Sequence, residues 1–559
     1  MNKLKLNILA LGLLCGWGMS SCSESFLDVE SKTESTTGTF YKTEGDAWRA
    51  LIGCYDGWKL TGYDSNGGFS FYVASEVMAD ECFGGTGNTD GRNHQLVDRF
   101  DITQSPSDLN VFESTWKSYY AAVYRCNELI AHEEQIQWKD ENKRKLYLGE
   151  CHALRAILYF DMVRLWGNIP LFTEPINENR EQADPSEVFE VIFSDLKYAV
   201  ENISADAYPK SESATNDGHV TKYAAAAMMA RAYLFYTGYY GVTPESVTKD
   251  EVLAGLEDII SSGEFDLIPE YKNLWPAAST KFAADSYNIA ECTYAGDGNK
   301  ETILAQKFTN TATYDNGNVD GNKWLVMVGI RGVNSSPYGK GWGACTVNPE
   351  FVKNYGTGDT RRSASVIDLE GEAITTVVDF EKNNKKDQRE YTGYTIKKYT
   401  PLSFFDGKPA PKPDGSGDMQ ISQNQDYVIM RYADVLLMAA ELGSPSAQDY
   451  FNKVRKRAYT TADGLSSSYT EVAVSNESIK KERMLEFAFE GVRYWDLLRQ
   501  GVDNAANAIA VSNYSVLSGG NPDAVTIAAS KIKETKGLCQ IPYNQINLSN
   551  NVLVQNAGW

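Results

Sequence analysis

The side chains that most often carry catalysis or hold metals are few here, or lack the spacing that such chemistry needs. The 559 residues include only four histidines, and none lies in an H-E-x-x-H pattern, so a zinc site on a helix lacks its ligands. No G-x-S-x-G or Walker sequence occurs, which removes the usual anchors of acyl transfer and phosphate binding. With 74 acidic residues, a carboxylate pair for glycoside hydrolysis stays open, and Asp80 with Glu81 is one such pair. We expect no catalytic residue, no metal and no cofactor.

Aromatic residues offer a different chemistry, the binding of flat apolar faces. They make up 12% of the chain and include 11 tryptophans. Most tryptophans fall on or beside predicted helices, whereas Trp275, Trp324 and Trp342 fall in irregular segments. The tyrosines in the same segments are Tyr287, Tyr294, Tyr314 and Tyr338. This distribution indicates a ring-lined binding surface on the irregular segments, with local packing of each ring as the alternative.

Residues 1–21 are typical of a lipoprotein signal peptide. Lys3 and Lys5 precede an apolar run, and small residues precede Cys22. The run is too short for a permanent membrane-spanning helix, and Cys22 is the expected site of lipid attachment. An ordinary secretory signal is the alternative. The net charge of −21 would repel the phosphates of nucleic acid, so nucleic acid is not an expected partner.

Helices are the elements that must position these groups. Apolar residues recur three and four apart in the segments 109–132, 140–166, 185–203, 221–238, 249–262, 427–442, 445–459 and 477–499. Strand-like runs are short, at 302–308 and 391–399. Paired helices with short turns predict a mainly α fold, in which tetratricopeptide-like helix pairs form a scaffold with long irregular loop excursions and a few short strands. No segment has a linker composition that would separate two independent domains.

Several motifs in a fixed order resemble the SusD/RagB family of cell-surface glycan-binding lipoproteins from Bacteroidetes nutrient-uptake systems. These motifs are Phe26-Leu27-Asp28 after Cys22, then ALRAILYFDMVRLWGNIPL at 153–171, the helix at 218–234, RYADVLLMAAE at 431–441, FEGVRYWDLLR at 489–499 and QNAGW at 555–559. The resemblance spans nearly the whole chain and is weakest at 264–348. Its charged residues thread through apolar helix faces, so we predict that they pair with each other; they are Arg431, Glu441, Glu482, Arg483, Glu490, Arg493 and Asp496.

The resemblance implies a function and an organisation. After the signal peptide, residues 22–559 would form a single SusD-like domain, with a helical scaffold at 40–263 and 427–500, ligand-binding excursions at 264–426 and a C-terminal docking segment at 501–559. The protein would be anchored by lipid in the outer membrane at the cell surface. It would capture an oligosaccharide or polysaccharide and deliver it to a SusC-like TonB-dependent transporter. A peptide-binding RagB-like protein and a surface glycosidase are the alternatives.

The resemblance also implies where a glycan would bind. The family commonly builds its site from a loop at 80–94 and from the mid-chain excursions. A sugar has an apolar C–H face and a polar rim, so rigid aromatic rings with nearby polar side chains suit it. The predicted glycan-binding residues are Trp275, Trp324, Trp342, Tyr314, Phe83, Asp80, Asn88 and Arg92.

Overall fold

Long helices form most of the structure, a computed structural model that describes residues 40–62, 69–101, 109–284, 286–313, 320–410, 412 and 415–559. The long helices are α3 (Glu44–Thr61), α6 (Glu113–Ala131), α7 (Glu141–Trp166), α8 (Pro185–Asn202), α10 (Lys222–Tyr239), α11 (Lys249–Ser261), α16 (Tyr432–Glu441), α17 (Ala447–Ala458) and α18 (Asn476–Glu486). Shorter ones include α4 (Phe71–Val77), α5 (Asn93–Asp98), α13 (Lys323–Val328), α19 (Arg493–Leu498), α20 (Val502–Ile509), α21 (Ala529–Glu534) and α22 (Tyr543–Leu548). The predicted mainly α class is confirmed.

Local sequence signals explain where these helices begin and end. Thr43 and Thr248 each form a capping box at the start of α3 and α11, which satisfies two backbone donors reciprocally. Asp184 caps α8, whose first residue is Pro185, a residue that suits this position. Helix α7 ends where Gly167 adopts a φ of +68°, as the sequence predicts for a glycine after the last apolar turn.

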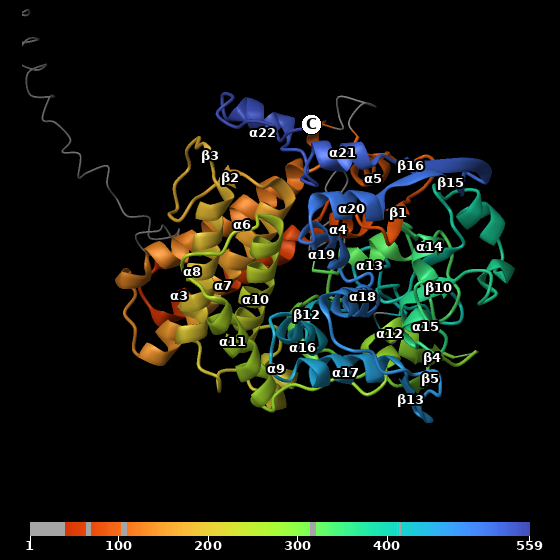
Figure 1. Ribbon diagram of the computed structural model, residues 1–559, viewed down its shortest axis with the longest axis horizontal. Coiled ribbons are helices and arrows are strands. Elements are labelled where there is room, and N and C mark those ends of the chain that lie inside the picture. The colour runs from red at the N-terminus through yellow and green to blue at the C-terminus, as the bar shows by residue number, and fades with distance from the viewer. Residues whose placement is uncertain are drawn as a thin grey trace, which may run out of the picture.

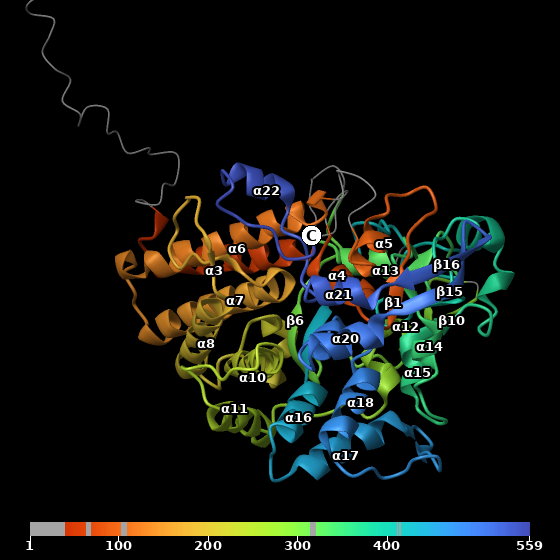
Figure 2. The same ribbon diagram turned by 45° about the horizontal axis from the view of Figure 1, so that its top comes forward.

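The helices pack as an array in which each contacts the next. Helix α3 packs on α6 and α7, and the chain of contacts continues through α8, α10 and α11 to α16, α17 and α18. Figures 1 and 2 show α3, α6, α7, α8, α10 and α11 on one side of the molecule, with α16 to α19 beside them. One large hydrophobic cluster extends from Tyr41 to Leu553. The packing therefore agrees with a stacked helix-pair scaffold.

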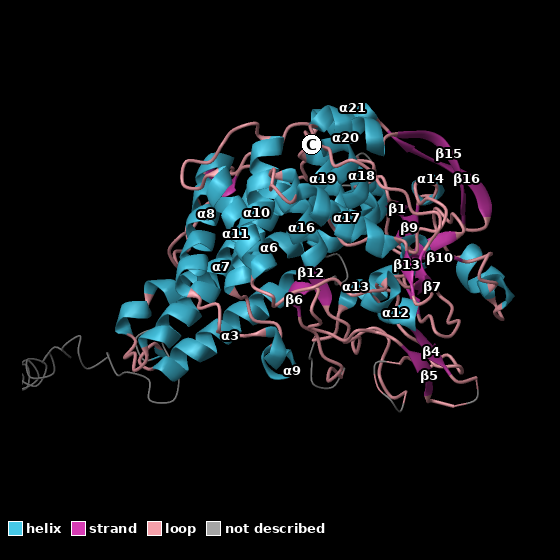
Figure 3. Cartoon of the chain, turned by 60° about the horizontal axis from the view of Figure 1, so that its bottom comes forward, coloured by secondary structure: helices cyan, strands magenta, loops and turns pink. Residues whose placement is uncertain are grey.

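Strands are mostly short, and many of them lie on the side of the molecule away from α3, α6 and α7 (Figure 3). An antiparallel sheet has the order β1 (Cys82–Gly84), β9 (Cys345–Val347), β11 (Tyr394–Ile396) and β10 (Val366–Asp368). The two-stranded sheets include β6 (Thr302–Gln306) with β12 (Tyr427–Arg431), β4 (Thr280–Phe282) with β5 (Ile289–Cys292), β2 (Ile169–Pro170) with β3 (Gln182–Ala183) and β15 (Val511–Ser518) with β16 (Asn521–Ile527). The predicted strand-like runs at 302–308 and 391–399 contain β6 and β11.

Two of the predicted helices differ from the observed ones. Residues 427–431 form strand β12, because their backbone pairs with that of β6. Helix α16 therefore begins only at Tyr432. The single helix predicted over 477–499 is interrupted between α18 and α19. There, Phe489 and Gly491 adopt φ angles of +63° and +69°, and no α-helix continues through that conformation.

A buried ion network links the irregular segments to the C-terminal helices. Its members are Glu301, Asp359, Arg361, Lys398, Arg431, Arg457, Glu482, Glu486 and Glu490, all buried. Arg431 lies at the centre, with guanidinium nitrogens 2.6 Å from Glu301, 3.0 Å from Glu486 and 2.7 Å from Glu490. Burial alone would raise the pKa of Glu486, but the surrounding arginines lower it to about 2.

The remaining members extend this network to other segments. Arg361 Nη1 lies 2.6 Å from Glu482 Oε1, and Lys398 Nζ lies 2.6 Å from Glu490 Oε1. The predicted pairing among the charged motif residues is confirmed for Arg431 with Glu490 and for Arg483 with Asp496, the latter at 2.8 Å. Glu441, Glu482 and Arg493 pair instead with Arg499, Arg361 and Asp80. No helix in the described ranges combines the length and the apolar character that a bilayer crossing requires.

Candidate functional site

Two of the predicted stacking tryptophans lie in the core. Trp275 is 1% exposed and Trp324 is fully buried. Both rings pack against Tyr399, with centroids 5.4 Å and 6.2 Å away. Phe83 is likewise buried, at 2% exposure. The prediction that these three residues contact a glycan is wrong for this structure, because irregular segments also need an apolar interior and these rings supply it.

The other predicted residues have different positions. Asp80 forms a bidentate ion pair with Arg493, at 2.7 and 2.8 Å, and so has a structural partner. Asn88 and Arg92 are exposed on a loop that Arg389 holds by donating to the carbonyl of Asn88 at 2.8 Å. Trp342 is half-buried. The contribution of Asn88, Arg92 and Trp342 to binding stays a prediction; Tyr314 and Cys22 lie outside the described residues.

The carboxylate pair Asp80 and Glu81 does not form an accessible acid–base site. Glu81 is 1% exposed and accepts a hydrogen bond from the backbone N–H of Phe489 at 3.0 Å. It faces Glu76, which accepts from the backbone N–H of Gly491 at 2.5 Å. Burial raises the pKa of Glu76 to about 7 and that of Glu81 well above its ordinary value. These acids therefore organise the break between α18 and α19, and Glu81 cannot reach a substrate.

Three buried thiols form the single cluster of potential metal ligands within the described ranges. Cys54, Cys126 and Cys151 come from α3, α6 and α7, and their sulfurs lie within 4.8 Å of one another. Each residue is fully buried. The cluster contains no fourth ligand, so it does not make the tetrahedral set that structural zinc requires.

Exposed rings occur instead on the β4–β5 hairpin and the loop that packs on it. We call Phe282, Tyr287, Phe404 and Phe405 the aromatic shelf. Phe404 is buried and forms the base, with its ring centroid 4.8 Å from Phe282 and 5.1 Å from Tyr287. Tyr287 and Phe405 are 38% and 41% exposed, and their centroids lie 5.8 Å apart. The shelf thus presents two neighbouring rings to solvent.

A tight turn holds the shelf in place. The backbone N–H of Phe404 donates to the carbonyl of Lys408 at 3.0 Å, and Gly407 adopts the φ of +82° that this turn requires. The hydroxyl of Tyr287 donates to Asp406 Oδ2 at 2.8 Å. Lys408 Nζ lies 4.7 Å from the centroid of the Tyr287 ring and also contacts its hydroxyl. Tyr287 is therefore fixed before any ligand arrives, which lowers the entropic cost of binding.

Polar groups border these rings. Contact with the Tyr287 hydroxyl and with Asp406 raises the pKa of Lys408, so its ammonium group stays charged. Rings flanked by a carboxylate and an ammonium group can stack on the C–H face of a sugar and hydrogen-bond its hydroxyls. The shelf lies within the excursions predicted to bind ligand, and Tyr287 is one of the tyrosines singled out in the sequence.

Sequence reasoning missed Phe404 and Phe405, because it searched the irregular segments for tryptophan and tyrosine. A usable signal was present in Phe404-Phe405-Asp406-Gly407. Two adjacent aromatic residues before an Asp-Gly turn point in different directions, so one can pack inward and leave the other exposed. The burial of Phe404 and the exposure of Phe405 follow this pattern.

The fold and the shelf define a helical scaffold protein with an exposed ring-bearing surface. Residues 300–559 match a sequence model described as the SusD family, and residues 81–234 match one described as starch-binding and associating with the outer membrane. Residues 300–559 therefore belong to the SusD family, and residues 81–234 resemble a related model.

Individual relatives agree with this assignment. SusD-like protein P38 of Formosa agariphila is 23% identical over 89% of this chain and 92% of its own length. A SusD-like protein of Bacteroides ovatus is 24% identical over 89% of this chain and 82% of its own length.

Solved structures share the fold. Surface glycan-binding protein A of Bacteroides thetaiotaomicron, in complex with laminarihexaose, superposes with a TM-score of 0.71 at 24% identity, covering 93% of this chain and 100% of the other. A laminarin-binding SusD-like protein gives a TM-score of 0.69 at 25% identity, with the same coverage of each chain.

Proposed function

We propose that this protein is a cell-surface lipoprotein that captures an oligosaccharide or polysaccharide on the aromatic shelf. The observation that carries the proposal is the exposed pair Tyr287 and Phe405, held by hydrogen bonds on a SusD-family scaffold. Binding without turnover is the favoured activity, since Asp80 is paired and Glu81 is buried. The laminarihexaose complex of a protein with this fold makes that hexasaccharide the first ligand to test.

Affinity electrophoresis of the mature chain through gels containing laminarin tests the proposal, with a glycan array to extend the range of ligands. The informative variant is Tyr287→Ala/Phe405→Ala. Tyr543→Ala is the matched control, because Tyr543 is 48% exposed on α22, far from the shelf. We expect the double variant to be retarded clearly less than the wild-type chain and the control to be retarded as strongly as the wild-type chain. Full retardation of a folded double variant would refute the role of the shelf.

The anchor and the partner are further parts of the proposal. We propose that Cys22 carries the lipid and that the protein delivers its glycan to a SusC-like TonB-dependent transporter, with residues 501–559 as the docking segment. Cys22→Ala should move the protein from the outer-membrane fraction to the soluble fraction. Affinity purification of the anchored protein should recover the transporter, and deletion of the β15–β16 hairpin tests the docking segment. Recovery of no transporter would contradict the delivery step.

A further inference from the structure

A ring-lined cavity lies on the helical scaffold, away from the shelf. We call it the α6 pocket; it has a volume of about 430 Å³, within the range of small-molecule sites. Its walls are helix α6, the loop 171–180 between β2 and β3, and the segment around α22. In Figure 1, α22 lies at the upper left and the β4–β5 hairpin at the lower right, so the two surfaces are separate.

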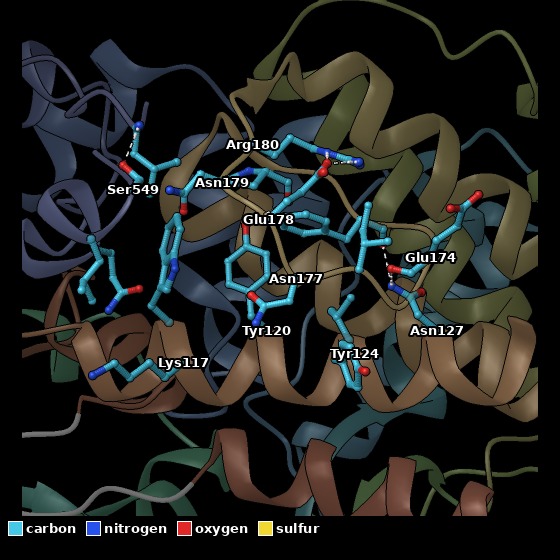
Figure 4. A pocket seen from close by; sticks show the side chains of 18 residues that line it. Lys117, Tyr120, Tyr124, Asn127, Glu174, Asn177, Glu178, Asn179, Arg180 and Ser549 are labelled. Atoms are coloured by element: carbon cyan, nitrogen blue, oxygen red, sulfur yellow. Dashed lines mark hydrogen bonds and ion pairs between the residues drawn. The ribbon is translucent and has the colours of Figure 1, made fainter. Parts of the chain in front are cut away.

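One face of α6 forms the floor of this pocket. Trp116, Tyr120 and Tyr124 are spaced four residues apart and therefore lie along one side of the helix. The ring centroids of Trp116 and Tyr120 are 5.1 Å apart. Tyr124 is 43% exposed, and Figure 4 shows Tyr120 directed toward the loop opposite, with Tyr124 further along the helix. Phe172 adds a fourth ring, 5.9 Å from Tyr120. Packing inside the scaffold does not require the exposed ring of Tyr124.

The opposite wall is fixed in place although it has no regular secondary structure. The hydroxyl of Tyr120 donates to the carbonyl of Pro170 at 2.9 Å, and Asn127 Nδ2 donates to the carbonyl of Phe172 at 2.9 Å. Arg180 donates to the carbonyl of Leu171 at 2.7 Å, and its guanidinium carbon lies 4.8 Å from the centroid of the Phe172 ring. The cavity is therefore formed before a ligand binds, which favours recognition of a small rigid molecule.

The rim supplies neutral hydrogen-bonding groups. Asn177 and Asn179 line the pocket with exposed side chains that have no hydrogen-bond partner among the residues that the structure describes. Figure 4 places Asn177 beside Tyr120, and Asn179 on the same loop nearer to Ser549. Each amide offers two donors and an acceptor, which matches the hydroxyl groups of a sugar.

The charges of the rim are largely paired. Arg180 lies 2.7 Å from Glu178, and Lys117 lies 2.6 Å from Glu113. No cation of the lining is left to hold an anionic ligand, and Glu174 at the same rim would repel one. The lining of the pocket therefore favours an uncharged, hydroxyl-rich ligand, because it combines an aromatic floor with free amide groups and balanced charge.

We propose that the α6 pocket is a second saccharide site, which takes one or two rings at the end of a neutral oligosaccharide. Tyr124 and Tyr120 stack on the sugar face, and Asn177 and Asn179 hydrogen-bond its hydroxyls. The class of ligand in this inference rests on the proposed glycan capture, whereas the location of the site rests on this cavity alone. It gives one chain two separate points of contact with carbohydrate.

Isothermal titration calorimetry of the mature chain tests this second site. The probes are laminarihexaose and neutral oligosaccharides of glucose, mannose, xylose and galactose. The pocket variants are Asn177→Ala/Asn179→Ala and Tyr124→Ala, which change exposed side chains and leave the core intact. Asn142→Ala, an exposed asparagine near the start of α7, is the matched control. The shelf variant is Tyr287→Ala/Phe405→Ala.

We expect two equivalents of ligand for the wild-type chain and the control, and one equivalent for the pocket variants, or pocket affinity weakened by about tenfold or more. Unchanged binding by both pocket variants would overturn the inference. Loss of all binding in the shelf variant would also overturn the inference. The proposed function would still hold in that case. Loss of all binding in the pocket variants alone would refute the shelf and support the pocket.

Two further results would count against the second site. If the wild-type chain binds no saccharide of the panel, the pocket and the proposed function both fail. If the pocket variants bind sugar normally but no longer recover the transporter, the cavity is a protein contact and the inference is overturned.

Discussion

The buried carboxyl group of Glu76 makes the stability of the folded protein depend on pH. The residue lies on α4, is 1% exposed, and faces the buried carboxyl of Glu81. Burial raises its pKa from 4.5 to about 7. Because the folded state holds this proton more tightly than the unfolded state, the stabilising contribution is fully present below pH 4.5 and is lost as the pH rises through about 7.

The size of the effect follows from these two pKa values. A change from 4.5 to about 7 corresponds to about 3 kcal/mol in the free energy of unfolding. Glu76→Gln removes the titration and keeps the Oε1 acceptor for the backbone N–H of Gly491. Its amide group can also donate to Glu81. The variant should therefore become more stable relative to the wild type, by about 3 kcal/mol, between pH 4 and pH 8.

Urea unfolding of both proteins at pH 4 and pH 8 measures this difference. Glu477→Gln is the control, since it makes the same chemical change at a side chain that is 84% exposed. A difference between Glu76→Gln and the wild type that stays constant from pH 4 to pH 8 would refute the assignment of a protonated buried carboxyl.

Three other substitutions test the fold and the corrected site. Arg431→Met leaves the buried carboxylates of Glu301 and Glu490 without their partner and should cost about 3–5 kcal/mol in urea unfolding; a loss close to zero would contradict the central role of this arginine. Gly167→Ala places a Cβ 2.8 Å from Leu538 at a φ of +68° and should lower stability by about 1–2 kcal/mol, read as a fall in the thermal midpoint. Trp324→Ala should cost about 3–5 kcal/mol without changing glycan affinity, measured by calorimetry where the variant is still folded. If a folded Trp324→Ala variant loses glycan affinity, Trp324 is a ligand contact after all.

Helix boundaries could be predicted where local chemistry decides them. Gly167 ends α7 and Pro185 begins α8, as the sequence indicates. The break between α18 and α19 could not be predicted in this way, since apolar spacing continues across it. It depends on Glu76 and Glu81, which lie some four hundred residues earlier in the chain and accept hydrogen bonds from the backbone of the break.

The candidate site shows the same division. The sequence located the excursions, and the shelf lies there. It could not show which rings face solvent, because Trp324 and Phe405 both lie in irregular segments and only tertiary packing separates them. The α6 pocket could not be predicted either, because its rings lie on a regular helix and not in an irregular segment. Trp116, Tyr120 and Tyr124 fit the spacing of a packed helix face, and nothing local shows that a loop stands off from that face.

The buried ion network also determines which parts of the chain are free to vary. Glu301, Arg361 and Lys398 stand at the bases of the excursions, and each is held by a buried charge, to Arg431, Glu482 and Glu490 respectively. Among the described residues, the tips beyond these points, such as 282–284, 286–289 and 404–408, bear none of these bonds. Insertions, deletions or grafted sequences at the tips should therefore leave the framework intact, so the surface of the excursions can be exchanged without rebuilding the core.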